Sequence, residues 1–387
     1  MRNFGIICEF NPFHNGHKQL FLRARELGAE RIVCVMSGNA VQRGDLACFD
    51  KYVRAKAAIA AGADLVLELP FPWSASGAEY FSRAGISIIS QLCDSVIFGS
   101  ECGDIKKLSD AARIAASESF REEFHTRTGD GERAAEVYFD MLSDGAEKFS
   151  SNDLLGIEYI RAAQDISPEL KFYTLKRKGA AYNSENIEEG QAPSAAAIRH
   201  LWQNGCFEDA QKHMPKEVYG IFEEAYYNGD MSDIYQLSRA ILMYFRLADP
   251  SDFLTVAESG GGIYNRIRSL ANECVNLEDL YKQLSTKRYT DAKLHRALLF
   301  CLCGVESELL KTSPEYTLVL AANEKGRELL SIARRSEGGI NIVTKPADAP
   351  MQSAQFEAQK RLEAVFSLAK MQPGASGEFL RKNAIIV

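Results

Sequence analysis

Short apolar runs and longer amphipathic segments alternate along the first 200 residues of the chain. The apolar runs show no polar alternation, which is typical of strands buried on both faces of a parallel sheet. The segments between them place apolar residues three or four positions apart, as helices with one buried face do. Strands separated by helices of this length predict βαβ units with right-handed crossovers. The expected strands are 4–8, 31–36, 64–69, 94–98 and 170–175, and the expected helices are 17–27, 50–62 and 77–92.

After about residue 200 the apolar positions follow the helical period almost throughout. Two short strands are expected near the end, at 316–322 and 339–344, followed by a helix over 353–370. A chain of 387 residues is too long for one compact core, so we expect two domains. These are an α/β domain with a Rossmann-like parallel sheet over 1–200 and a mainly helical domain over 201–387.

The composition, 46% hydrophobic and 25% charged, is ordinary for a globular protein, and no run of about 18 apolar residues predicts a membrane span. The first residues lack the long apolar region of a signal peptide. The nine cysteines form no CxxC pair, which favours reduced thiols, a cytoplasmic location and no metal site. The net charge of −7 argues against a protein that coats nucleic acid, although a local basic face remains compatible with it.

The segment 9–20 follows the first expected strand, opens the first expected helix and contains His14, Gly16 and His17. A helix N-terminus attracts anions through its dipole and its free N–H groups. Gly16 has no Cβ that would keep a nucleotide from the backbone. Two imidazoles three residues apart can donate to oxygens that gain charge when an α-phosphate is attacked, so we predict that His14 and His17 are catalytic. The alternative is a helix cap with two surface histidines.

This strand, turn and histidine pattern resembles the HIGH nucleotidyltransferase superfamily, and more closely the bacterial tRNA(Met) cytidine acetate ligase family. The resemblance extends through 35–70, 98–105, 151–160, 175–183, 194–199 and 285–299. It implies a sheet of the HIGH nucleotidyltransferase type followed by a tRNA-binding domain. It also implies an enzyme that forms acetyl-AMP from acetate and ATP and then acetylates the wobble cytidine of elongator tRNA(Met).

The resemblance implies ATP contacts at the motif and at three later places. The residues are Ile7, Cys8, Glu9, Phe10, Asn11, Pro12, Phe13, His14, Asn15, Gly16, His17, Lys18, Gln19, Leu20, Gly99, Asn152, Arg177 and Lys178. Other interpretations remain open for the later four: Gly99 as a simple turn, Asn152 as a helix N-cap, and Arg177 and Lys178 as solvated charge.

Two positions depart from the family pattern. Ala196 stands where the family has a hydroxyl residue, which leaves Ser194 and Arg199 as the phosphate candidates of that stretch, and Leu46 replaces a proline. Arg43 lies on the loop after the second strand, where it can hold a carboxylate or phosphate or pair with an acidic neighbour. Asp64 and Glu68 flank a buried strand and are expected to be structural.

A basic stretch with one tyrosine lies near the start of a helical pattern at 285–299. Lysine and arginine bind phosphates and tyrosine stacks on bases, so the stretch suits a tRNA surface. We predict tRNA contacts from Lys287, Arg288, Lys293 and Arg296, with Tyr289 on the same face as the last two. The alternative is a solvated helix face.

Three functions compete. The first is the acetate ligase, with ATP and acetate as small substrates and magnesium accompanying the ATP phosphates rather than a metal held by the protein. The second is a small-molecule adenylyltransferase that transfers AMP to a phosphorylated cofactor precursor, although the long segment after residue 200 favours a macromolecular substrate. The third is a nucleotide-binding or RNA-binding protein without catalysis, against which the two histidines argue.

Overall fold

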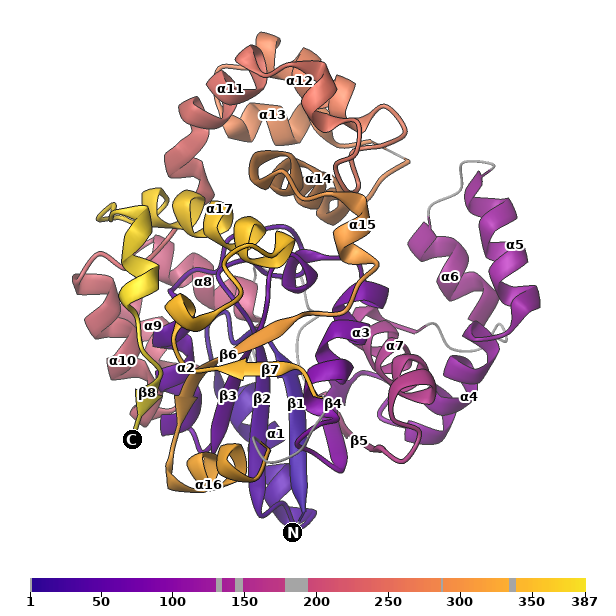
Figure 1. Cartoon of the computed structure of the whole chain (residues 1–387), viewed down its shortest axis with the longest axis vertical. Coiled ribbons are helices and arrows are strands. Elements are labelled where there is room, and N and C mark those ends of the chain that lie inside the picture. Colours follow the sequence, from indigo (N-terminus) through magenta and orange to yellow (C-terminus); the bar gives the residue numbers. More distant parts are fainter. Residues whose placement is uncertain (1, 130–133, 143–148, 178–193, 287, 334–338) are drawn as a thin grey trace.

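The computed structural model describes residues 2–129, 134–142, 149–177, 194–286, 288–333 and 339–387 (Figure 1). An eight-stranded sheet carries helices on both faces, and its strands follow the order β5-β4-β1-β2-β3-β6-β7, with β8 paired to β6. The strands are β1 Asn3–Cys8, β2 Arg31–Ser37, β3 Leu65–Leu69, β4 Ser95–Ser100, β5 Lys171–Lys176, β6 Tyr316–Ala322, β7 Asn341–Val343 and β8 Ile385–Ile386.

The first five strands are parallel, as predicted, and each begins within a residue of its expected start. From β1 the chain adds β2 and β3 on one side and then returns to add β4 and β5 on the other. The order therefore reverses between β1 and β4, and open α/β sheets bind ligands outside the carboxyl ends of the strands at such a point. One expectation was wrong: β5 is an edge strand and its residues are exposed or half-buried, not buried on both faces.

Side chains alternate between two apolar layers because successive residues of a strand point to opposite faces. In β1, Phe4 and Ile6 join one core and Ile7 joins the other. The core with Phe4 includes α1 (Asn15–Glu26), α2 (Lys51–Ala60), α8 (Ala195–Gln203), α9 (Phe207–Lys212) and α10 (Lys216–Tyr227). The core with Ile7 includes α3 (Ala78–Ile89), α4 (Ile105–Ala115), α5 (Glu118–Gly129), α6 (Ala134–Leu142), α7 (Ser151–Ile166) and α16 (Glu324–Ala333).

A further helical group, whose buried residues belong to the core with Ile7, sits toward the end of the sheet to which β1 runs (Figure 1). It contains α11 (Ser238–Leu247), α12 (Ile263–Glu273), α13 (Leu277–Leu284), α14 (Asp291–Cys303) and α15 (Ser307–Leu310). The remaining long helix, α17 (Ala354–Leu368), lies between this group and the sheet. Short 3₁₀ helices occur at Trp73–Ala75, Ile234–Leu237, Pro250–Phe253, Pro346–Asp348 and Ser376–Arg381.

The chain returns to the sheet after the helical group, so residue 200 does not divide the sheet from the rest. Both strands expected near the end are present, and β6 pairs antiparallel with β3, Leu65 opposite Ala322. β7 and β8 then pair parallel with β6. Helices α8 to α10 also pack into the core that contains Phe4. Among the described residues, the helical group is thus an insertion between β5 and β6.

A buried ion network ties the last long helix to the sheet. The Lys51 ammonium lies 2.9 Å from carboxylate oxygens of both Glu68 and Glu363, and all three side chains are almost completely buried. Asn39 and Gln359 donate further hydrogen bonds to Glu363, at 3.0 and 2.7 Å. The two carboxylates thus share one ammonium, and Glu363 also has two amide donors, which is how a charged group is accommodated without water. Asp64, like Glu68, was expected to be structural, and it accepts hydrogen bonds from Arg25, Asn323 and the Ile32 N–H. Asp64 and Glu68 therefore both have structural partners.

In the described part of the chain, no helix is long and apolar enough to cross a bilayer. All nine cysteines carry free thiols, and six of them are buried.

Candidate active site

The two motif histidines lie against each other where β1 gives way to α1. Their rings are stacked with centroids 3.7 Å apart. His14 caps the helix, its Nδ1 accepting the Gly16 N–H at 3.0 Å, and the His17 Nδ1 accepts the His14 N–H at 3.2 Å. The Nδ1 atom of each ring therefore already accepts a hydrogen bond from the backbone. A neutral imidazole that accepts at Nδ1 carries its proton on Nε2, so each ring keeps one Nε2–H donor for a ligand.

Burial keeps both rings neutral. It lowers the pKa of His14 to about 3, with smaller contributions from the charges of Arg177 and His213. Burial, the neighbouring His14 and Arg177 also hold the pKa of His17 well below its usual value. A neutral Nε2–H donor stabilises developing negative charge without itself changing protonation state. The cap interpretation and the catalytic interpretation are thus compatible, because Nδ1 serves the cap while Nε2 remains for a ligand.

Gly16 is required by the histidines themselves. A Cβ at this position would lie 2.8 Å from the Cε1 atom of His14, closer than carbon atoms pack. One expectation about this turn was wrong: its N–H groups are not free. The Asn15 N–H donates to the His213 carbonyl, that of Gly16 to His14 Nδ1, and that of His17 to the His14 carbonyl. The helix dipole remains, but the hydrogen-bond donors for an anion are the imidazoles rather than these backbone groups.

A second set of polar groups lies at the ends of β4 and β5. The Arg177 Nε lies 3.4 Å from the Glu101 carboxylate, which also accepts the Asn152 amide at 2.6 Å. Gly99 leaves room for this arginine, since a Cβ there would lie 3.3 Å from the Arg177 Cγ. The charge of Arg177 also helps to lower the pKa of both histidines. The predicted residues Gly99, Asn152 and Arg177 therefore lie together at one edge of the sheet, whereas Lys178 is outside the described residues.

The N-cap interpretation of Asn152 was wrong. Ser150 caps α7 and forms a reciprocal pair with Asp153, while Asn152 sits in the first turn. Asp153 is buried and accepts from the Ser100 hydroxyl at 2.6 Å and from the Cys102 N–H at 3.1 Å. This carboxylate fixes the loop after β4. The serine–aspartate spacing of a capping box was visible in the sequence and would have identified it.

The remaining residues predicted to contact ATP differ in the exposure of their side chains. Five of them have buried side chains, which leaves only their backbone for a ligand: Ile7, Phe10, Pro12, Phe13 and Leu20. Asn15 and Gln19 are exposed, and Cys8 is half-buried with its thiol near the Val35 carbonyl, at 3.8 Å. Lys18 bonds to Glu217 and to the Ala61 carbonyl, both at the α2 and α10 side.

Two arginines, Arg54 and the half-buried Arg199, hold the loop that carries the motif, and no sequence pattern pointed to Arg54. Arg54 is fully buried and donates to the carbonyls of Glu9, Ser37, Gly38 and Phe49. Arg199 donates to the Asn11 carbonyl at 2.7 Å, and the Asn11 side chain accepts the Cys48 N–H at 2.7 Å. Arg199 thus acts on the loop backbone, while Ser194 caps α8.

Glu9 directly follows β1, beside these arginines. Its carboxylate accepts the Gln42 N–H at 2.8 Å. Burial raises its pKa, although this hydrogen bond and the charges of Arg199, Arg43 and Arg54 oppose the rise. The contact joins β1 to the loop after β2, on which Arg43 and Asp45 lie.

That loop also contacts the helical group. The Asp45 carboxylate lies 2.9 Å from Nδ1 of His295, which belongs to α14. Gly44 has φ +81° and approaches the backbone of α14 so closely that a Cβ would lie 2.3 Å from the Arg296 nitrogen. A glycine is needed here both for the left-handed conformation and for the close approach. The start of α14 is therefore one loop away from the end of β1.

The predicted tRNA residues occupy the turn before α14 and its first turns. The Arg288 guanidinium and the Lys293 ammonium lie over the Tyr289 ring, 5.3 and 5.0 Å from its centroid. Tyr289 precedes the helix, which Thr290 caps, so its proximity to Lys293 does not come from a shared helical face. Arg296 forms a two-pronged ion pair with Glu258, which occupies its donors and partly neutralises it. Lys287 is outside the described residues.

No group of three histidine, cysteine or acidic side chains that could hold a metal ion occurs in the part of the chain that the structure describes.

Known proteins share the sequence pattern and the fold of this chain. The HIGH Nucleotidyl Transferase family matches residues 1–378. The tRNA(Met) cytidine acetate ligase of Clostridium perfringens is 33% identical, covering 90% of this chain and 91% of that relative. The protein of the same name from Caldanaerobacter subterraneus subsp. tengcongensis is 34% identical, covering 95% and 96%. The crystal structure of apo Thermotoga maritima TmcAL matches all of both chains with a TM-score of 0.90 and 28% identity. The same protein bound to alpha-thio ATP gives 0.87 and 27%, also over all of both chains.

Proposed function

Because the chain belongs to the HIGH nucleotidyl transferase family and, within it, to the tRNA(Met) cytidine acetate ligases, we propose that it joins acetate to elongator tRNA(Met) at the expense of ATP. The observation that carries this proposal is the stacked pair of neutral histidines at the switch point of the sheet. Each directs Nδ1 into the helix cap and retains an Nε2–H for a phosphate oxygen.

In the first step, a carboxylate oxygen of acetate attacks the α-phosphorus of ATP. The bond from that phosphorus to the oxygen bridging to the β-phosphate breaks, and pyrophosphate leaves with its electron pair. His14 and His17 stabilise the charge that accumulates on the α-phosphate oxygens, and Arg177 contributes a fixed positive charge. Asn152 and Gly99 would line the same edge, with Glu101 holding Asn152 and Arg177 in place.

In the second step, the exocyclic amine of the wobble cytidine attacks the acetyl carbon. The bond between that carbon and the phosphate oxygen breaks, AMP leaves, and the amine loses a proton. Water would hydrolyse the acetyl-adenylate, so a small closed site is required. We propose that the segments 35–38 and 68–73, which end β2 and β3 with mostly apolar side chains, wall the acid site.

Contacts to the tRNA are proposed for Arg288, Lys293 and Lys287, with Arg296 supporting the turn through Glu258. Magnesium is proposed to arrive with the ATP phosphates, which supply its hard oxygen ligands. A tRNA substrate and a set of free thiols fit the cytoplasm.

The alternative, transfer of AMP to a small phosphorylated compound, would use the same histidines. The relatives named above match this chain over nine-tenths of both lengths, including the helical group, which a small substrate would not need.

The proposal is tested with purified protein, ATP, labelled acetate and bulk tRNA, scored for acid-stable label in RNA. Labelling that requires ATP and is abolished by His14→Asn is expected. Acetate should outcompete butyrate at least tenfold, because a methylene that does not fit costs about 1–3 kcal/mol. Release of pyrophosphate only with a phosphorylated small molecule, and no label in RNA, would establish the alternative.

A further inference from the structure

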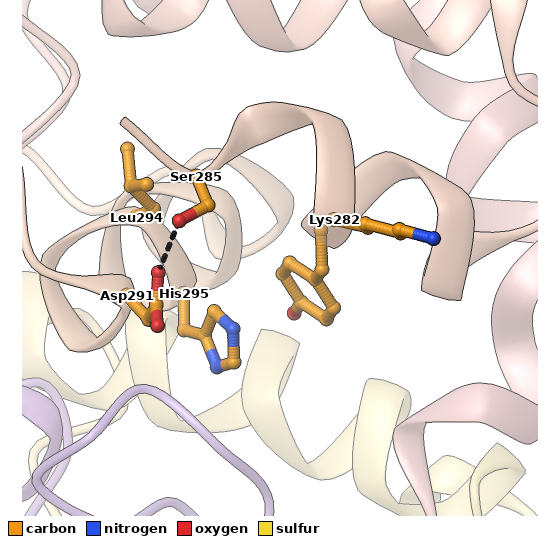
Figure 2. Close-up of a pocket in the computed structure, with 6 residues that line it drawn as sticks. Lys282, Ser285, Asp291, Leu294 and His295 are labelled. Carbon is orange, nitrogen blue, oxygen red and sulfur yellow. Dashed lines mark hydrogen bonds between the residues drawn. The ribbon is translucent and has the colours of Figure 1, made fainter. Parts of the chain in front are cut away.

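A pocket of about 260 Å³ lies in the helical group, between the end of α13 and the start of α14 (Figure 2). It is lined by Tyr281, Lys282, Ser285, Asp291, Leu294 and His295. None of these residues comes from the motif loop or from the ends of β4 and β5. The pocket is therefore distinct from the site where the acid and the α-phosphate would react.

One wall of the pocket is aromatic. The rings of Tyr281 and His295 stack with centroids 4.0 Å apart and an angle of 29° between their planes. Leu294 is buried and adds an apolar surface. A heterocyclic base binds to surfaces of this kind, because its flat faces stack on aromatic rings and its removal from water is favourable.

The polar groups of the pocket leave hydrogen-bonding capacity for a ligand. The Tyr281 hydroxyl is buried and has no hydrogen-bond partner among the described residues. A buried hydroxyl without a partner costs free energy, so a ligand that supplies one gains affinity. At the rim, the Ser285 hydroxyl donates to Asp291 at 2.9 Å, whereas the exposed Lys282 side chain points away from this pair (Figure 2).

The surroundings of the pocket select RNA over a free metabolite. Arg288 and Lys293 lie on the same short stretch between Ser285 and His295, and Arg288 is exposed, so a phosphate backbone can be held beside the pocket. His295 also contacts Asp45, on the loop whose Gln42 N–H binds Glu9 at the end of β1. This loop thus connects the pocket with the end of β1, where the adenylate would form.

We propose that this pocket receives one unstacked base of the anticodon loop, a neighbour of the cytidine that is acetylated. The inference rests on the proposed tRNA substrate. The captured base is not modified; it fixes the register of the loop so that the adjacent cytidine reaches the acetyl group. Loops of RNA are the usual targets of such contacts because their bases can leave the stack.

Filling the pocket tests the proposal. Ser285→Trp places an indole at the rim, and Ser269→Trp on α12, also at an exposed serine, is the matched control. The probe is an anticodon stem-loop RNA carrying 2-aminopurine at one loop position at a time. With wild-type protein, fluorescence should be quenched by stacking at one position. Ser285→Trp should abolish that signal and weaken binding about tenfold or more, in the range of one lost stacking contact. Acetate-dependent pyrophosphate exchange without RNA should not change.

Tyr281→Phe gives a second measurement that does not depend on a bulky substitution. It removes a hydroxyl that makes no hydrogen bond among the described residues, so the fold is retained. RNA affinity should fall about fivefold, the effect of one hydrogen bond. Equal RNA affinity of Ser285→Trp and Ser269→Trp would overturn the pocket assignment, as would unchanged affinity of Tyr281→Phe. If wild-type protein shows the position-specific quenching yet places no acetyl group on tRNA, the ligase function fails while the base pocket stands.

Discussion

The imidazoles of His14 and His17 share one turn of backbone: each accepts an N–H from it through Nδ1, and the two rings stack 3.7 Å apart. The cap therefore fixes the tautomer of both rings. A substitution that keeps the hydrogen-bond acceptor at the position of Nδ1 but removes the Nε2–H donor therefore separates the structural role of each histidine from its catalytic role.

Asparagine is such a residue, because its side-chain oxygen reaches about as far as Nδ1. His17→Asn should preserve the cap and keep the thermal midpoint close to that of wild type. The rate of acetate-dependent pyrophosphate exchange should fall by about 100-fold or more, a typical loss for one donor to a developing oxyanion. His17→Ala should lose both the hydrogen bond from the His14 N–H and the activity, with about 1 kcal/mol less stability. An exchange rate near wild type in His17→Asn would remove His17 from the chemistry.

The low pKa of His14 predicts a pH-dependent stability. The unfolded ring binds a proton below about pH 6.5, whereas the folded ring stays neutral until about pH 3. The unfolded state therefore binds more protons in this window, so stability is full above pH 6.5 and declines as the pH falls toward 3. Between pH 7 and 5, His14 should account for about 2 kcal/mol of the loss.

Urea unfolding at several pH values measures this effect. His14→Asn should flatten the decline between pH 6.5 and 5, and His200→Asn, which replaces an exposed histidine, should not. Parallel curves for wild type and His14→Asn would contradict the prediction.

The ion network beneath the loop after β2 should respond strongly to loss of its only ammonium among the described residues. Lys51→Met leaves the Glu68 and Glu363 carboxylates buried without their cation, which should cost about 3–5 kcal/mol in the free energy of unfolding. Lys360→Met, on α17 but in an exposed pair with Glu357, should change it by less than about 1 kcal/mol. Equal effects of the two substitutions in urea unfolding would show that the network adds nothing to stability.

Charge reversal at Arg288 and Lys293 should separate the two half-reactions. The double substitution to glutamate should weaken tRNA acetylation and reduce its dependence on salt, because phosphate contacts release counterions. Pyrophosphate exchange without tRNA should remain normal. The matched control reverses Lys311 and Lys360, two exposed lysines elsewhere. Normal acetylation by the Arg288 and Lys293 variant would leave this turn as solvated surface.

Local patterns predicted the local structure well. The five parallel strands, the motif turn and the last long helix follow from apolar runs and from their spacing, which act over a few residues. Contacts that join distant segments were not predicted. The antiparallel pairing of β6 with β3 and the Arg296 pair with Glu258 depend on tertiary packing that periodicity does not encode. Arg54 was missed for the same reason, since its four acceptors are backbone carbonyls, which carry no sequence signal.

Within the motif, the residue types pointed to the chemistry, but the hydrogen bonds changed the mechanism drawn from them. The turn N–H groups were expected to meet the phosphates, yet the histidines themselves accept two of the hydrogen bonds in this turn. Only the three-dimensional structure distinguishes an N–H group that is free to bind a ligand from one that already donates a hydrogen bond to a neighbouring side chain.

The return of β6 to the sheet has a consequence for synthesis on the ribosome. β3 is complete by Leu69, but its antiparallel partner spans Tyr316–Ala322, about 250 residues later in translation. Until that partner emerges, the apolar stretch Leu65–Leu67 of β3 presents an unpaired edge, and such edges recruit strands from other chains. At about 5–20 residues per second, the exposure lasts tens of seconds or less. The nascent chain therefore passes through an aggregation-prone interval that the finished protein no longer shows, and substitutions that slow the docking of β6 should lower the soluble yield before they lower activity.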